Sequence, residues 1–162
     1  MKNKYTFEEL WNRLPESIRI DCDNCEQNKK YHPEGVVSQH IRLVFDFADT
    51  NFNGDVDLLL CAIFHDLGKP ETIIKKEVDG EIRISNIGHE MKCVKYIDLY
   101  FDLFSDISTN KDKIIEVCEN HMKAHLYESG LLKKPKKRQA FEELAYFDDI
   151  MNFLQCDAGG RE

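Results

Sequence analysis

The sequence predicts an all-α protein, a helical bundle that carries one small β-hairpin at about residues 72–86. Three observations lead to this prediction. Apolar residues recur at spacings of three and four along five segments, as on the buried face of a helix. Two short β-branched runs flank Asp79-Gly80, a dipeptide typical of a tight hairpin turn. The 162 residues contain no internal repeat and no linker rich in Pro or Gly, so a single domain over residues 1–162 is expected.

The expected elements follow in chain order. A short helix capped by Thr6 should stop near Pro15, and the polar residues 21–35 should be irregular and end in a turn at 31–35. Two helices are expected at about 36–49 and 55–66, separated by a loop at 51–54. Three more should follow the hairpin, at about 88–104, 111–127 and 140–157.

Composition limits the classes of function. Hydrophobic residues make up 42% of the chain and charged residues 32%, which is ordinary for a globular protein outside a membrane. The net charge of −8 argues against long nucleic acid as an obligate partner, but it leaves room for a small phosphate ester. No signal-peptide core or membrane span is expected, and the six cysteines resemble reduced core thiols, so a cytoplasmic location is expected.

The pair His65-Asp66 ends the apolar run 56–64 and draws attention to other polar residues on apolar faces. The five long helices each place at least one metal-competent side chain inward. These side chains are His40, His65, Asp66, His89, His121 and Asp157. A lone buried histidine is more often a hydrogen-bonded core residue, but an unpaired buried carboxylate costs several kcal/mol. One or two divalent cations would satisfy the whole set, and its nitrogen and oxygen donors suit Mn, Fe, Co, Ni, Zn or Mg.

The order of these residues resembles the signature of HD-domain metal-dependent phosphohydrolases. The similarity is closer to the HD domain of bacterial CCA-adding tRNA nucleotidyltransferases. It rests on Tyr31-His32-Pro33-Glu34-Gly35, Phe64-His65-Asp66-Leu67-Gly68-Lys69-Pro70, Gly88-His89-Glu90, Asn120-His121 and Cys156-Asp157-Ala158-Gly159-Gly160-Arg161. The match covers about residues 31–161, leaves 1–30 as an N-terminal extension, and contains nothing of the nucleotidyltransferase domain. Only the phosphohydrolase part is therefore implied, with an HD-domain helical bundle as its fold.

The resemblance also implies roles for individual residues. His40, His65, Asp66 and Asp157 would bind a first metal, and Asp66 would bridge to a second metal held by His89 and His121. A metal-activated hydroxide would then attack a phosphomonoester or a 2′,3′-cyclic phosphodiester of a nucleotide or RNA terminus. Lys69 would contact a phosphate oxygen during catalysis; its alternative role is a cation at a helix C-terminus.

Weaker signals surround this set. His32 and Glu34 could bind substrate, orient His40 or another ligand, or merely cap a loop. His125 lies four residues after His121 on the same helix face and could contact substrate or only pack. Arg161 follows Asp157 by one turn and could clamp the substrate or belong to a frayed terminus.

Two further features stay open. Cys22 and Cys25 form a CxxC without a second pair at zinc-ribbon spacing, so a structural zinc site is not favoured. The run at 133–138 holds five cations in six residues; a solvated loop is the default interpretation, and attraction of a nucleotide or RNA end is the alternative.

Two other functions compete with hydrolysis. HD-type mixed-valent di-iron oxygenases share the same series of ligands. A non-catalytic module could bind a nucleotide in a retained metal pocket. The sequence leaves the native metal, the number of ions, the substrate and the oligomeric state undetermined.

Overall fold

A computed structural model describes residues 5–161. Residues 1–4 and 162 lie outside the described part, and the start of the segment in which no signal peptide is expected is among them. No helix within the described part is both long and apolar enough to cross a membrane.

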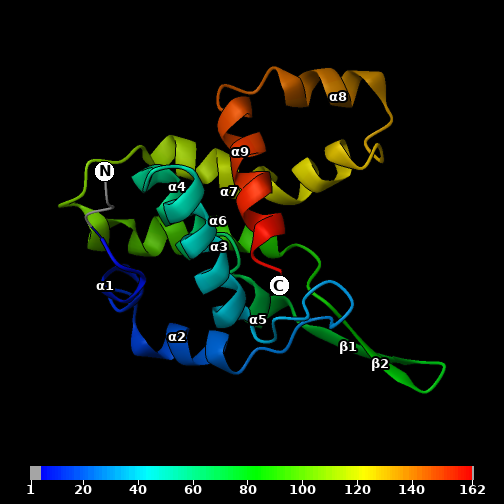
Figure 1. The fold of residues 1–162 in the computed structure, drawn as a ribbon. Helices are drawn as coiled ribbons and strands as arrows, with labels where there is room; N and C mark the ends of the chain where they lie inside the picture. The colour runs from blue at the N-terminus through cyan, green and yellow to red at the C-terminus, as the bar shows by residue number, and fades with distance from the viewer. Residues whose placement is uncertain (1–4, 162) are drawn as a thin grey trace.

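The bundle is built around α4 (Val56–Phe64), with α3 (Val37–Asn51), α6 (His89–Tyr100), α7 (Lys111–Glu128) and α9 (Phe147–Gly159) packed against it (Figure 1). Asp55 caps α4 by accepting hydrogen bonds from the backbone N–H groups of Asp57 and Leu58. Residues 58–64 are all buried, because a helix that is apolar on every side must lie at the centre of the protein. The prediction of an all-α bundle with one hairpin is confirmed.

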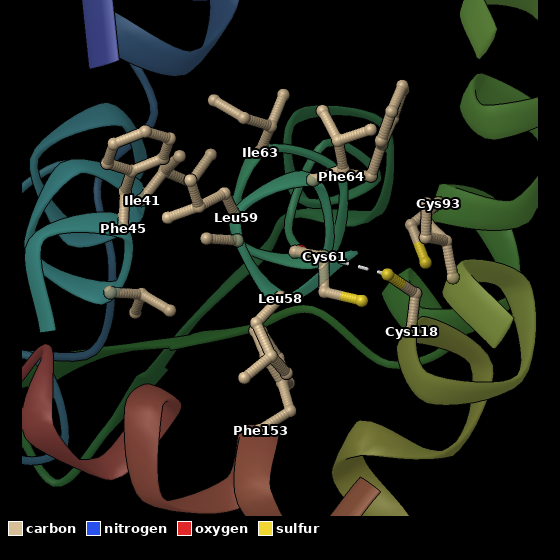
Figure 2. Close-up of a cluster of buried hydrophobic side chains, with 14 of the residues drawn as sticks. Ile41, Phe45, Leu58, Leu59, Cys61, Ile63, Phe64, Cys93, Cys118 and Phe153 are labelled. Atoms are coloured by element: carbon tan, nitrogen blue, oxygen red, sulfur yellow. Dashed lines mark hydrogen bonds between the residues drawn. The ribbon is translucent and has the colours of Figure 1, made fainter. Parts of the chain in front are cut away.

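Figure 2 shows how the central helix packs. Leu58, Leu59, Ile63 and Phe64 of α4 meet side chains from four other helices. These partners include Ile41, Phe45, Cys93, Cys118 and Phe153. The Cys118 thiol donates a hydrogen bond to the carbonyl oxygen of Cys61 across the core, at 3.7 Å. All six cysteines are free and buried, in agreement with the prediction of core thiols.

The hairpin consists of β1 (Ile74–Val78) and β2 (Glu81–Ser85), paired antiparallel, and it projects from the bundle (Figure 1). Its two turn residues, Asp79 and Gly80, have φ angles of 53° and 80°. Two positive φ angles in a row define the type I′ turn that Asp-Gly favours. The hairpin therefore lies within the range predicted from the sequence.

The structure corrects two element boundaries near the N-terminus. Thr6 and Glu9 form a capping box that begins α1 (Phe7–Trp11). The next segment was expected to be irregular from residue 21, but helix α2 (Glu16–Asp23) extends to Asp23 and the irregular part begins after it. Pro15 occupies the N-cap of α2, so this proline starts a new helix as well as following the first one.

The region 133–157 was also wrong in detail. A single helix was expected at 140–157, yet α8 (Pro135–Glu142) and α9 are separate. Between them, the backbone N–H of Tyr146 donates to the carboxylate of Glu116 on α7, at 2.7 Å. The loop interpretation of the basic run fails from Pro135 onward, because proline at the first helical position starts α8.

Two short helices complete the fold. The 3-10 helix η1 (Phe101–Phe104) extends α6 to the residue where the predicted helix was expected to end. Helix α5 (Lys69–Thr72) follows the His65-Asp66 pair directly. Gly68 lets this segment approach α6, because a Cβ at this position would lie 2.5 Å from the carbonyl oxygen of His89.

Candidate metal centre

The structure brings the six candidate ligands together from five parts of the bundle. His40 comes from α3, His65-Asp66 from the end of α4, His89 from the first residue of α6, His121 from α7 and Asp157 from α9. Each of them is at most 4% exposed. Among these six residues, two groups of three have one donor atom from each residue within 4.8 Å of the others. One group is His40, His65 and Asp66, and the other is Asp66, His89 and His121.

Asp66 links the two groups through its two carboxylate oxygens. Its Oδ2 lies 3.3 Å from His65 Nε2 and 3.5 Å from His40 Nε2. Its Oδ1 lies 3.2 Å from His89 Nε2 and 3.6 Å from His121 Nε2. Each oxygen therefore faces one pair of imidazoles, which is the arrangement expected of a bridging carboxylate.

Asp157 lies on the side of the first pair only. Its Oδ1 is 2.8 Å from His40 Nε2 and 3.5 Å from His65 Nε2. The cluster therefore has two halves of unequal composition. One half contains two histidines and two aspartates, and the other contains two histidines and the shared Asp66.

All four histidines turn the same nitrogen toward the carboxylates. Each Nδ1 is hydrogen-bonded to a backbone carbonyl, with distances of 2.8 Å for His40–Gly160, 2.8 Å for His65–Ala62, 2.8 Å for His89–Asn86 and 2.6 Å for His121–Cys118. Because a carbonyl can only accept, Nδ1 carries a proton, and the lone pair of a neutral ring lies on Nε2 and faces the cluster. Histidines that bind metals are commonly fixed in this way.

Two buried atoms of the cluster have no hydrogen-bond partner, and two more face each other unfavourably. Within residues 5–161, His65 Nε2 and Asp66 Oδ2 are buried without a hydrogen bond. The Nε2 atoms of His89 and His121 lie 3.1 Å apart, so in the tautomer fixed by their Nδ1 contacts two lone pairs oppose each other. A divalent cation would satisfy all of these atoms, and imidazole with carboxylate is a donor set that transition-metal ions accept.

The electrostatics of the cluster favour positive charge. Burial alone would raise the pKa of Asp66, but His65, Lys69 and His121 outweigh it and hold this pKa well below its usual range. Burial would lower the pKa of His65, yet the carboxylates of Asp66 and Asp157 raise it to about 10. The buried carboxylates thus require cationic partners, which are Lys69 together with protonated histidines or bound metal.

Lys69 lies beside the bridging carboxylate. Its Nζ is 2.9 Å from Asp66 Oδ2 and donates a hydrogen bond of 2.7 Å to Gln27 Oε1. The contact with Asp66 is a close ion pair between two buried groups. Lys69 is the first residue of the four-residue helix α5, which is a single turn, and it is only 5% exposed.

Gln27 was missed by the sequence analysis. It is 4% exposed, and its Nε2 donates to the carbonyl oxygen of Gly35 at 2.9 Å while its Oε1 accepts from Lys69. It lies in a polar, irregular segment without periodicity, so no sequence pattern marks it as buried. Its side chain connects the turn at 31–35 to the lysine of the site.

His32 and Glu34 lie behind His40. Glu34 Oε1 is 2.9 Å from His32 Nδ1 and 2.7 Å from His40 Nδ1, although the His40 N–H is directed at Gly160. Burial and the nearby Lys69 ammonium lower the pKa of His32 to about 4, so its ring is neutral at physiological pH. Of the roles considered for this pair, the geometry favours orientation of His40.

His125 and Arg161 approach the other oxygen of Asp157. His125 Nε2 lies 2.6 Å from Asp157 Oδ2, and the Arg161 guanidinium lies 3.8 Å from the same oxygen. Arg161 is also 3.4 Å from His125 Nε2. These contacts place Arg161 against the cluster, which does not agree with a frayed terminus.

A cavity of about 610 Å³ opens from the cluster to solvent. Asp66, Lys69, His89, His121 and Asp157 are among the residues that line it. His32, His125 and Arg161 line it as well, whereas His40 and His65 do not. A ligand that enters this cavity can therefore reach both halves of the cluster.

Two sequence features lie outside the centre. Cys22 and Cys25 are buried and belong to none of the metal-competent groups found among the described residues. Lys133, Lys134, Lys136, Lys137 and Arg138 are exposed and form no ion pair with any residue between 5 and 161. Arg138 instead lies over the ring of Tyr127, at 5.2 Å from its centroid.

The fold and this site define an all-α protein with a buried cluster of histidines and aspartates that could hold metal ions. The chain is 28% identical over 152 residues to the multifunctional CCA protein of Methylobacillus flagellatus, a match that covers 91% of this chain and 35% of that protein. Proteins of the same name from Paracidovorax citrulli and Janthinobacterium sp. are each 26% identical, over 152 and 139 residues. These two matches cover 91% and 83% of this chain, and 34% and 32% of the relatives.

The chain thus spans about a third of the length of the curated relatives it matches. No protein-family model matches it. A coverage of 91% exceeds residues 31–161 alone, so the similarity extends into the segment that the motifs left as an N-terminal extension. The comparisons therefore support a resemblance between this chain and one region of the CCA proteins, about a third of their length.

Proposed function

We propose that this protein is an HD-domain phosphohydrolase that depends on divalent metal ions and hydrolyses phosphomonoesters, 2′,3′-cyclic phosphodiesters, or both. One observation carries the proposal. Four buried histidines, each fixed through Nδ1 by a backbone carbonyl, direct Nε2 at the carboxylates of Asp66 and Asp157. Such a cluster at the base of a solvent-open cavity suits metal-assisted chemistry on an anionic substrate.

The residues divide between two metal positions. His40, His65, Asp66 and Asp157 would hold one ion, and His89 and His121 with the other oxygen of Asp66 would hold a second. Bound divalent cations at these positions would polarise a phosphoryl oxygen and make water more acidic. The shared carboxylate keeps the two positions adjacent, because each of its oxygens faces a different pair of histidines.

Lys69 would stabilise the negative charge that develops on the phosphoryl oxygens. It is buried at the cavity wall and already lies beside Asp66, so its charge is held in place before a substrate arrives. Gln27 would orient it by accepting a hydrogen bond from Nζ. Charge fixed in a dry site acts more strongly than the same charge on a mobile side chain in water.

The remaining residues would act around this centre. Arg161 and His125 line the cavity beside Asp157 and would contact a second oxygen of the substrate. Glu34 would hold His40 in orientation, with His32 between Glu34 and the cavity. The resemblance of the sequence motifs to the HD domain of CCA-adding tRNA nucleotidyltransferases favours a nucleotide or the end of an RNA as the substrate, and five exposed cations at 133–138 could attract such a polyanion.

The test is a metal-dependent assay of the purified chain. After treatment with EDTA, the protein is supplied with Mn²⁺, Co²⁺, Ni²⁺, Zn²⁺ or Mg²⁺ and assayed on p-nitrophenyl phosphate, its bis ester and 2′,3′-cyclic nucleotides. Asp66→Asn should lose both bound metal and hydrolysis. Asp148→Asn, an exposed aspartate on the same helix as Asp157, is the matched control and should retain both.

Two results would contradict the proposal. Hydrolysis that survives Asp66→Asn would assign the activity to another site. A protein that contains iron as purified, consumes oxygen and hydrolyses none of the esters would instead support the di-iron oxygenase alternative.

A further inference from the structure

The cavity above the metal cluster has a polar base and an apolar mouth. Its base is formed by buried residues such as Asp66, His121 and Lys69. Four apolar side chains at its mouth are strongly exposed, namely Tyr31 (53%), Ile87 (81%), Met122 (37%) and Leu126 (44%). Single exposed apolar residues are common on protein surfaces, but four around one cavity indicate a binding surface.

The chain fixes this apolar mouth relative to the metal cluster. Each of the four residues is a close neighbour in sequence of a histidine that lines the cavity. Tyr31 precedes His32, Ile87 is two residues before His89, Met122 follows His121 and Leu126 follows His125. Met122 and Leu126 are four residues apart on α7, so they share one helix face. The segments that position the imidazoles therefore also position the apolar side chains.

The shape and chemistry of the cavity indicate what it accepts. A volume of about 610 Å³ lies in the range of pockets that enclose an organic ligand, and it far exceeds the needs of one phosphate group. Lys69 and Arg161 supply positive charge within the cavity, whereas the mouth offers an aromatic ring, a thioether and two branched aliphatic groups. A ligand that satisfies both regions is anionic at one end and flat and apolar at the other.

We propose that Tyr31, Ile87, Met122 and Leu126 form a subsite for an aromatic ring, such as a nucleobase, carried by the phosphate ester that the metal centre hydrolyses. This inference rests on the proposed function and adds the residues that select the leaving group. Tyr31 can stack on a ring of any base, and Met122 can adapt to its edge. Small polar leaving groups such as glycerol would not contact these side chains.

The test compares two non-hydrolysable ligands that differ only in the ring. Phenylphosphonate and methylphosphonate carry the same anionic group, and their affinities for the Mn²⁺-loaded protein are measured by isothermal titration calorimetry. Phenylphosphonate should bind roughly tenfold more tightly, because the ring removes apolar surface from water at the mouth of the cavity.

Leu126→Ser should weaken phenylphosphonate binding roughly fivefold and leave methylphosphonate unchanged, since about half of this side chain is available for burial by a ligand. Leu99→Ser is the matched control, because Leu99 is 57% exposed on helix α6 and does not line the cavity. Ile87→Ser, in the loop before α6, repeats the test without altering a helix and should show the same selective loss.

The outcomes separate this subsite from the proposed function. Equal affinity for the two phosphonates would overturn the subsite and leave a metal site that binds phosphonate. Failure to bind either ligand would overturn both proposals. A dimer in sedimentation velocity that Leu126→Ser dissociates, while Leu99→Ser does not, would assign the apolar mouth to self-association and overturn the subsite.

Discussion

One residue, Asp66, connects both halves of the cluster of histidines and aspartates. Asp66→Asn keeps the size of the side chain but removes the charge that faces four imidazoles at 3.2–3.6 Å. Both proposed metal positions would lose their shared ligand in a single substitution. We therefore expect metal affinity at both positions to fall at least about 100-fold, above the 10- to 100-fold loss typical of residues that only support a ligand.

The expected change in thermal stability follows from the linkage between binding and folding. Metal at about 100 times its Kd stabilises the folded state by roughly 2.7 kcal/mol, and after a 100-fold loss of affinity by only about 0.4 kcal/mol. In a domain of this size, 1 kcal/mol corresponds to about 2–4 °C in Tm. Mn²⁺ should therefore raise the Tm of the wild type by about 5–11 °C and that of Asp66→Asn by about 1 °C.

The assay is differential scanning calorimetry of each variant with EDTA and with Mn²⁺, together with the metal content of the protein. Asp66→Asn should also lower the stability of the metal-free protein by roughly 3 kcal/mol, because the buried ammonium of Lys69 loses its carboxylate. Comparing each variant with and without metal removes this baseline effect. A wild-type metal content and a wild-type shift in Tm for Asp66→Asn would refute the assignment of a bridging carboxylate.

Other substitutions test the support of the site. Gln27→Ala should lower kcat roughly tenfold at unchanged metal content, whereas Gln39→Ala, at an exposed glutamine, should leave kcat unchanged. If Gln27 acts through Lys69, then Gln27→Ala should cause no further loss of kcat in a Lys69→Met background. An additive loss of kcat in the double variant would contradict this role. Gly68→Ala should lower the free energy of unfolding in urea by about 1–3 kcal/mol and weaken metal binding, because the new Cβ would push against α6. An unchanged midpoint of urea unfolding would show that α6 moves to make room for the methyl group. Phe153→Ala should lower the free energy of unfolding by about 3–5 kcal/mol, because its buried ring contacts His65 and His121. A loss below 1 kcal/mol would mean that the core closes around the cavity left by the ring.

Local signals in the sequence predicted most of the fold. Apolar spacing located α3, α4, α6 and α7 to within a few residues, and Asp79-Gly80 located the hairpin. The prediction of the final helix failed at a position where the apolar spacing is weak and a tertiary contact is present. The expected final helix is split because Glu116 on α7 binds the backbone of Tyr146, a partner 30 residues away that no local pattern reveals.

The candidate ligands were predictable for a related reason. A carboxylate or imidazole on an apolar helix face is conspicuous in the sequence because burial without a partner is costly. Gln27 lacked any such signal, since a polar residue in a polar segment is assumed to face water. Its burial depends on the packing of α2 against α3 and α5, which brings it to Lys69, 42 residues later in the chain.

The sequence by itself determined which side chains of the periodic helices must be buried. Helical periodicity is a local property, so it can be read from the order of the residues alone. Only the tertiary structure decided how those side chains meet. His40 and Asp157 are 117 residues apart, and their contact at 2.8 Å depends on how α3 and α9 pack around α4. The orientation of each imidazole, the pairing of Asp66 with both halves of the cluster and the apolar mouth of the cavity all arise from that packing, which no local pattern specifies.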